Sequence, residues 1–148
     1  MKRVYPNKDF CIGCRLCELA CLTAHSESKD LIIAYTQERL TGLAPCKAVY
    51  ENGPVCVSLS CRHCEDAFCV STCISGALYK DKATGKTMYN ESKCVGCWSC
   101  MMACPYGAIK RNPVKKKIIK CDLCEGREMP ACVEACPNAA LVYEDRDE

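Results

Sequence analysis

The sequence predicts an α+β fold with short helices and short antiparallel hairpins, and three observations lead to this prediction. Sixteen of the 18 cysteines fall into four ordered quartets along the 148 residues. Apolar segments of a few residues flank turn sequences, which is typical of short hairpins. Phe and Trp together account for only three residues, too few for a conventional core. Bound metal is therefore expected to stabilise the chain in place of a large apolar core.

Short strands are predicted on both sides of several turns. Val4-Tyr5 near the start can pair with residues 140–143 near the end, which would bring the two termini together. The apolar residues 31–35 are expected to form a strand or a packed segment. The predicted hairpins join residues 47–50 with 55–59, 77–79 with 87–89, and 107–110 with 117–120.

Two short helices are expected to carry the later cysteines of a quartet. They cover residues 14–24 and 97–103, because cysteines at i and i+4, such as Cys17 and Cys21, lie on one face of a helical turn. After three of the four quartets a turn and a strand-like segment follow the last cysteine. The chain is therefore built from an internal repeat.

The spacing of the cysteines predicts iron–sulfur clusters. Quartets one and three read C-x2-C-x2-C-x3-C, which ligates such clusters in bacterial ferredoxins, and sixteen thiolates are what four 4Fe–4S clusters need. Gly13 and Gly96 precede the second cysteines of these quartets and are expected to let backbone N–H groups approach the cofactor. The quartets are Cys11, Cys14, Cys17 and Cys21; Cys61, Cys64, Cys69 and Cys73; Cys94, Cys97, Cys100 and Cys104; and Cys121, Cys124, Cys132 and Cys136.

Quartets two and four leave a different class of protein open. Four residues separate Cys64 from Cys69, and seven separate Cys124 from Cys132. Either quartet alone could bind zinc, so a structural zinc-binding interaction module is the alternative. Four sets that each end in C-x3-C favour iron–sulfur clusters over zinc.

Charge and composition narrow the function classes. The formal net charge of +2 would fall to about −6 with four clusters bound, which argues against nucleic acid as a partner. No apolar segment follows Lys2 and Arg3, and no apolar run approaches membrane-spanning length. We therefore expect a cytoplasmic protein without direct membrane insertion, in a compartment that keeps thiols reduced. No catalytic triad, phosphate loop or dinucleotide fingerprint occurs, so we expect a protein that is not an enzyme.

The sequence resembles the four-cluster, ferredoxin-like electron-transfer subunits that accompany molybdenum oxidoreductases, formate dehydrogenases and hydrogenases. The similarity covers all four quartets. Pro105 and Pro137 complete the ferredoxin signature in quartets three and four, whereas Leu22 and Ile74 depart from it in the other two. Within this group, the segments around the quartets are similar to the small iron–sulfur partner of anaerobic nickel-containing carbon monoxide dehydrogenase.

This resemblance implies two interleaved bacterial-type 2[4Fe-4S] ferredoxin modules, in which each quartet lends its last cysteine to a partner quartet. The outer module would comprise residues 1–30 and 115–148, and the inner module residues 55–114, with residues 31–54 as a connecting insertion. The implied ligands are Cys11, Cys14, Cys17 and Cys136 for cluster one; Cys61, Cys64, Cys69 and Cys104 for cluster two; Cys94, Cys97, Cys100 and Cys73 for cluster three; and Cys121, Cys124, Cys132 and Cys21 for cluster four.

The same resemblance implies a function in electron transfer. The chain would relay single electrons through four 4Fe–4S clusters, from carbon monoxide dehydrogenase to a hydrogenase or an NAD(P)H oxidoreductase. The alternative is the equivalent subunit of a formate dehydrogenase–hydrogenase complex.

A few residues near the quartets are open to more than one interpretation. Cys46 and Cys56 lie outside the quartets and are expected to be buried thiols, with a disulfide or a site shared with a partner as the alternative. His63 is expected at the surface or beside the cluster ligands. Trp98 is expected to shield a cluster from water, and His25 is assigned no role.

Overall fold

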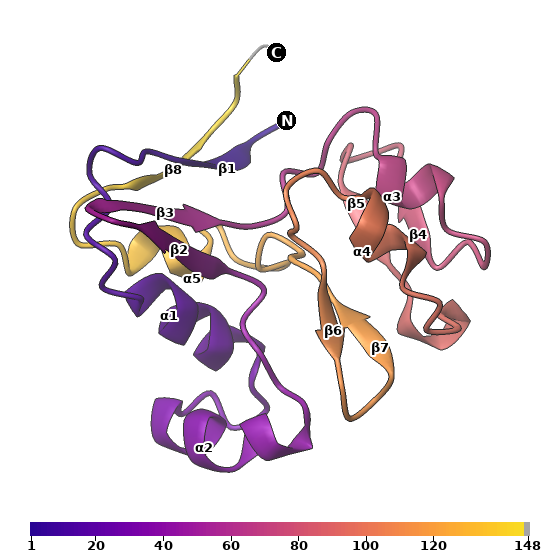
Figure 1. Cartoon of the computed structure of the whole chain (residues 1–148), viewed down its shortest axis with the longest axis horizontal. Coiled ribbons are helices and arrows are strands. Elements are labelled where there is room, and N and C mark those ends of the chain that lie inside the picture. Colours follow the sequence, from indigo (N-terminus) through magenta and orange to yellow (C-terminus); the bar gives the residue numbers. More distant parts are fainter. Residues whose placement is uncertain (147–148) are drawn as a thin grey trace.

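The computed structural model describes residues 1–146, and in them every strand belongs to a two-stranded antiparallel sheet (Figure 1). The strands are β1 (Arg3–Pro6), β2 (Ala48–Asn52), β3 (Val55–Leu59), β4 (Leu78–Lys80), β5 (Thr87–Tyr89), β6 (Lys110–Asn112), β7 (Lys117–Ile119) and β8 (Leu141–Glu144). The helices are α1 (Leu16–His25), α2 (Leu31–Thr36), η1 (Glu38–Thr41), α3 (Phe68–Ser71), η2 (Glu91–Lys93), α4 (Ser99–Ala103) and α5 (Ala131–Glu134). Short helices combined with antiparallel pairs confirm the α+β class.

The two ends of the described chain pair with each other. In the β1–β8 sheet, Val4 lies opposite Tyr143 and Tyr5 opposite Val142, which confirms the predicted pairing. The amino group of Met1 extends this contact by donating to the carboxylate of Asp145 at 2.7 Å. Segments that begin and end the chain thus form one sheet (Figure 1).

The three predicted hairpins are present. Strand β2 pairs with β3, β4 with β5, and β6 with β7. The last of these begins at Lys110, so its first strand lies at the end of the predicted segment 107–110. Gly107 occupies the turn before it with a φ of 57°, a conformation that glycine adopts without strain.

The prediction of a strand at residues 31–35 is wrong, because these residues form helix α2. Asp30 caps the helix: its carboxylate accepts hydrogen bonds from the amides of Ile32 at 2.8 Å and Ile33 at 3.0 Å. An N-cap of this kind satisfies donors that a helix start leaves free, and it outweighs the low helix propensity of the β-branched pair. Ile32 is 72% exposed, so a large part of this helix faces outward.

The interior is built largely from cysteine. The main cluster of buried residues combines cysteines with a few aliphatic side chains and includes Val4, Val49, Leu123 and Leu141. Its cysteines are Cys17, Cys21, Cys46, Cys61, Cys121 and Cys132. The thiols therefore occupy the place of a conventional apolar core, as the scarcity of aromatic residues predicts.

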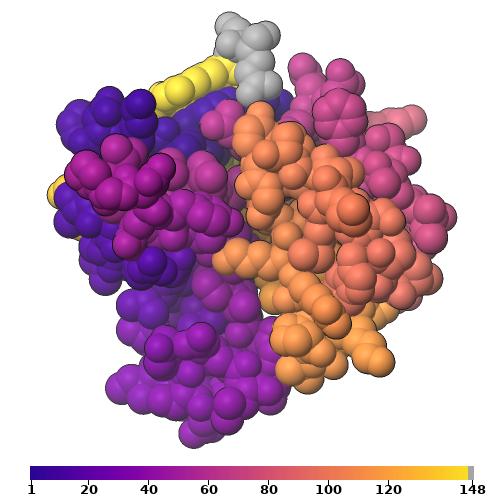
Figure 2. Space-filling model, viewed as in Figure 1, coloured from indigo at the N-terminus to yellow at the C-terminus, as the bar shows by residue number. Residues whose placement is uncertain are grey.

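A groove of about 800 Å³ is lined by the segment around η1, by hairpin β6–β7 and by the loop of quartet four. In Figure 2 the purple segment that includes η1 and the orange hairpin lie next to each other. Asn112 links the two by donating from Nδ2 to the Gly42 carbonyl at 3.0 Å. Among the helices of residues 1–146, none has both the length and the apolar character needed to cross a membrane.

Candidate metal centres

Three hollows in the structure are each lined by four cysteines. Each takes three cysteines from one quartet and the fourth from another quartet, and each encloses a similar volume of about 20 Å³. We call these sets group one (Cys11, Cys14, Cys17, Cys136), group two (Cys61, Cys64, Cys69, Cys104) and group three (Cys73, Cys94, Cys97, Cys100). These are the sets that the family resemblance implies as cluster ligands, and their role as ligands stays a prediction.

The remaining cysteines of the quartets form group four (Cys21, Cys121, Cys124, Cys132), and all four are buried. Burial, with a smaller contribution from the charge of Cys21, raises the pKa of Cys121 to about 12 and that of Cys132 to about 11. Cys21 itself is the acidic member. The neighbouring Cys46 thiol and the His25 ring lower its pKa.

His25, to which the sequence analysis assigned no role, links helix α1 to the loop of quartet four. Its Nε2 lies 2.9 Å from Oδ1 of Asp122, and its Nδ1 lies 2.7 Å from the carbonyl oxygen of Cys21. The hydrogen bond with Asp122 is the main reason that the pKa of His25 rises to about 11. This imidazolium holds the helix that carries Cys17 and Cys21 against the loop that carries Cys121 and Cys124.

All four quartets share one backbone feature at the residue before the second cysteine. This residue has a left-handed conformation in every case, with φ values of 71° at Gly13, 50° at His63, 71° at Gly96 and 62° at Leu123. The turn aims amides at sulfur where the structure shows the contact. The amide of His63 donates to Cys61 Sγ, and that of Leu123 donates to Cys121 Sγ, both at 3.4 Å.

Further donors reach the sulfurs from outside these turns. The amides of Leu78 and Ala108 donate to Cys73 Sγ and Cys104 Sγ, each at 3.4 Å. The thiol of Cys17 shares a hydrogen bond with the Ser58 hydroxyl at 3.2 Å. Donors aimed at sulfur favour the thiolate, which is the form that ligates iron. Four-sulfur groups with such donors fit 4Fe–4S clusters, because hydrogen bonds to the sulfurs also set the potential of a bound cluster.

Lysine side chains place positive charge against three of the cysteine loops. Lys80 donates to the carbonyl of Cys64 at 2.7 Å, and Lys120 donates to that of Cys121 at 2.8 Å. Lys117 donates to the carbonyl of Cys94. These ammonium groups bind the backbone and leave the sulfurs free. They fix the loops and lower the cost of gathering anionic thiolates.

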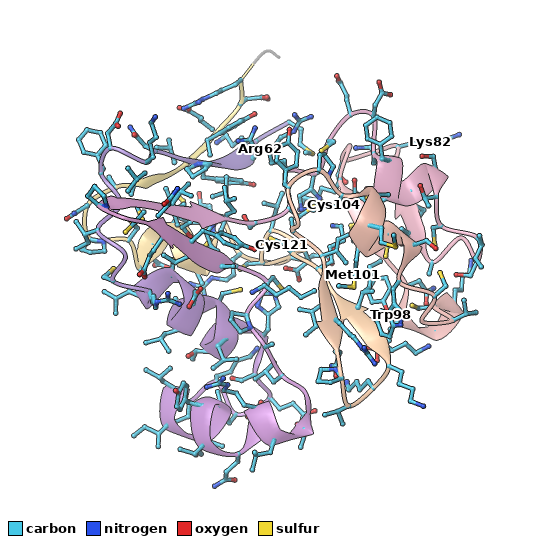
Figure 3. The ribbon with its side chains drawn as sticks, in the orientation of Figure 1. Arg62, Lys82, Trp98, Met101, Cys104 and Cys121 are labelled. Atoms are coloured by element: carbon cyan, nitrogen blue, oxygen red, sulfur yellow. The ribbon has the colours of Figure 1, made fainter. Side chains whose placement is uncertain are left out.

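His63 is buried, with no exposed surface, so the structure favours the interior position over the surface. Its Nδ1 accepts a hydrogen bond from the amide of Thr87 at 3.1 Å, which joins the loop of quartet two to strand β5. Burial lowers its pKa to about 3, so the ring is neutral. Trp98 lines the hollow of group three, and the Arg111 guanidinium lies 4.8 Å from the centre of its ring (Figure 3).

The two cysteines outside the quartets are both free thiols. Cys46 is buried against Cys21 and His25, close enough for the three ligand atoms to lie within 4.8 Å of one another. Cys56 is partly exposed and lies opposite Glu51 in hairpin β2–β3. The expectation of a buried thiol thus holds for Cys46 and only in part for Cys56.

Comparison with known proteins identifies relatives of this arrangement. A family model described as a 4Fe-4S dicluster domain matches residues 54–146. The putative electron transport protein YsaA of Escherichia coli K12 is 40% identical over 134 residues, which cover 88% of this chain and 82% of that protein. The B subunit of anaerobic dimethyl sulfoxide reductase from the same organism is 39% identical, over 93% of this chain and 70% of that protein. In the solved active-site complex BamBC of benzoyl coenzyme A reductase with 1,5-dienoyl-CoA, one polypeptide is similar with a TM-score of 0.54 and 25% identity, covering 100% of this chain and 78% of that one.

Proposed function

Because the chain belongs to the family of 4Fe-4S dicluster proteins, we propose that it is a non-catalytic subunit that transfers single electrons within an oxidoreductase complex. It binds 4Fe–4S clusters, which supply centres that take up and release one electron at a time. The observation that carries the proposal is the arrangement of twelve quartet cysteines around three hollows, each lined by cysteines from two quartets.

In this proposal each cysteine group holds one cluster. The left-handed turns at Gly13 and Gly96 keep the loops close to the cofactor, and backbone amides donate to the sulfurs elsewhere. Trp98 restricts water at group three. Arg62 lies over the ring of Tyr106, at 4.6 Å, on the hollow of group two. The chain's own residues thus bind the clusters, orient them and exclude solvent, which are the tasks of an electron-transfer scaffold.

We further propose that the groups work in two nested modules. Helix α1 packs on α5, which joins quartets one and four, and α3 packs on α4, which joins quartets two and three. The β1–β8 sheet joins the two segments of the outer module, residues 1–30 and 115–148, and the inner module of residues 55–114 lies beside it (Figure 1). Strand β2, in the connecting insertion of residues 31–54, pairs with β3, the first strand of the inner module.

For the partner, we propose carbon monoxide dehydrogenase as the electron donor and a hydrogenase or NAD(P)H oxidoreductase as the acceptor, in an anaerobic cytoplasm. The quartet segments support this choice through their resemblance to the iron–sulfur partner of that enzyme. A formate dehydrogenase–hydrogenase complex is the second candidate. One relative is the B subunit of dimethyl sulfoxide reductase. This similarity supports the more general proposal that the chain binds a catalytic oxidoreductase subunit.

Anaerobic purification of the full chain tests the proposal. We expect a brown protein with about 16 iron atoms per chain that dithionite reduces and an oxidised acceptor reoxidises. A colourless, folded protein loaded with zinc would instead establish the zinc-binding module. Purification from the native host then identifies the large subunit that accompanies the chain. Recovery with a formate dehydrogenase would contradict the narrower choice of donor and leave the electron-transfer function in place.

A further inference from the structure

Lys47, just before strand β2, is the most deeply buried charged side chain of the described residues, at 1% exposure. Its Nζ donates to the hydroxyl of Ser60 at 3.0 Å. Within residues 1–146 no carboxylate forms an ion pair with it, and the nearby carboxylate of Glu18 is engaged by Arg15 and by the amide of Val49. A buried ammonium with one neutral partner is costly unless an anion lies close by.

The cysteine groups near Lys47 are the candidates for this anion, because a bound cluster with its thiolate ligands carries negative charge. Cys17 and Cys132 belong to the same buried cluster as Val49, which lies two residues after Lys47. Ser58, two residues before the serine that accepts from Lys47, contacts Cys17 Sγ at 3.2 Å. Cys17 belongs to group one and Cys132 to group four. The ammonium is therefore placed close to the cysteines of two different groups.

Hairpin β2–β3 is built to hold the ammonium in this place. Ser58 lies in β3 and Ser60 directly follows its last residue, and both side chains are buried. Ser58 contacts Cys17 Sγ, while Ser60 holds the Lys47 ammonium. From the other direction, Lys110 donates to the carbonyl of Lys47 at 2.6 Å and fixes its backbone. The hairpin thus presents a hydroxyl and a cation to the groups that lie under it.

The three lysines that contact the cysteine loops differ from Lys47 in burial and in hydrogen-bond partner. Lys80, Lys117 and Lys120 are only partly buried and donate to backbone carbonyls of the cysteine loops. Among the described residues, Lys47 Nζ donates to no backbone carbonyl, and its hydrogen-bond partner is the Ser60 hydroxyl. Groups two and three have no fully buried lysine of this kind in residues 1–146.

We propose that Lys47 is a built-in counter-cation for groups one and four, which raises the reduction potential of the clusters held there. The inference rests on the proposed function, since it requires bound clusters. Reduction adds one electron, supplied by the donor protein or by dithionite, and makes a cluster more negative by one charge. No bond forms or breaks. A fixed positive charge in a poorly solvated place favours the more negative state.

The test is an EPR-monitored redox titration of the full-length holoprotein carrying Lys47→Met. For two of the four clusters we expect the equilibrium constant of reduction to fall by about tenfold or more, which is 59 mV for one electron. The other two should keep their potentials. Lys47→Arg retains the charge and should restore most of the shift. Lys82→Met, which removes an exposed lysine from the turn between β4 and β5, is the matched control and should shift nothing.

Iron analysis separates this inference from the proposed function. A wild-type chain without iron would overturn both. A Lys47→Met protein with full iron and unchanged potentials, or with all four potentials shifted alike, would overturn the inference alone. Should Lys47→Met fail to retain iron, the double variant with Ser60→Ala replaces it, because it leaves neither buried polar group without a partner. Unchanged potentials in that variant would equally overturn the role of Lys47.

Discussion

Gly96 faces the backbone of Lys116 so closely that a Cβ on Gly96 would lie 2.5 Å from the Lys116 carbonyl oxygen. The contact joins the loop of quartet three to the turn of hairpin β6–β7. Lys117, the next residue of that hairpin, donates to the carbonyl of Cys94 in the same loop. The hairpin therefore holds in place the loop that carries three of the cysteines of group three.

Gly96→Ala should disrupt the contact between this loop and the hairpin. The substitution adds the cost of a left-handed alanine, about 1–2 kcal/mol, and the overlap with the Lys116 carbonyl costs about 1–3 kcal/mol more. Gly76→Ala is the matched control, because Gly76 has a φ of 64° but no atom within 4 Å of the added Cβ. Iron content and the thermal midpoint of the anaerobic holoprotein report the difference. Equal losses in the two variants would show that the close contact has no energetic weight.

Lys80→Met should destabilise the loop of quartet two. Lys80 donates to the carbonyls of Cys64 at 2.7 Å and Gly85 at 2.6 Å, and methionine leaves both without this partner. We expect a loss of about 1–3 kcal/mol in the free energy of unfolding. Lys82→Met, two residues along, removes a side chain that points away from the molecule (Figure 3) and should change stability little. Denaturant titration under anaerobic conditions measures both, and a Lys80→Met midpoint equal to that of the control would contradict the role of Lys80.

Cys104→Ser tests the crossed grouping of the cysteines. Cys104 is the last cysteine of quartet three in the sequence, yet it lines the hollow of Cys61, Cys64 and Cys69. We therefore expect its EPR changes to match those of Cys61→Ser and to differ from those of Cys97→Ser. About a quarter of the iron should be lost or altered, since one of four clusters is affected.

The control for this experiment is Cys56→Ser, because Cys56 lies outside the four groups. It should retain all four clusters. A Cys104→Ser spectrum that matches Cys97→Ser would show that each quartet holds its own cluster and would refute the crossed grouping.

The sequence predicts the hairpins well because their signals are local, with turn residues between short apolar segments. It predicts the β1–β8 pair from matching apolar segments at the two ends of the chain. The left-handed turns at Gly13 and Gly96 are also visible, since glycine is the residue that takes this conformation freely. The same turns at His63 and Leu123 carry no such signal. There the surrounding loop imposes the conformation on a residue that does not prefer it.

Contacts made by single side chains across the fold account for what sequence reasoning missed. His25 and Asp122 are 97 positions apart, and no spacing rule connects them. Helix α2 depends on the N-cap at Asp30. The apolar pattern of residues 31–36 does not indicate a helix, and the only helix signal in the sequence is the capping residue before them. Lys47 reads in the sequence as an ordinary lysine beside a strand, and only the packing of hairpin β2–β3 makes it an interior charge.

Removal of metal should unfold most of the chain. The main core contains Cys17, Cys21, Cys61, Cys121 and Cys132, so the loss of clusters leaves polarisable thiols around empty space where an aliphatic core would lie. We expect an anaerobic chelator to abolish the far-UV circular dichroism signal of the strand pairs and to expose the chain to protease. Reconstitution with iron and sulfide should restore both properties, because metal binding and folding are coupled. An apo chain that keeps its native spectrum and protease resistance would show instead that the aliphatic side chains, with Val4 and Leu141 among them, suffice to hold the fold.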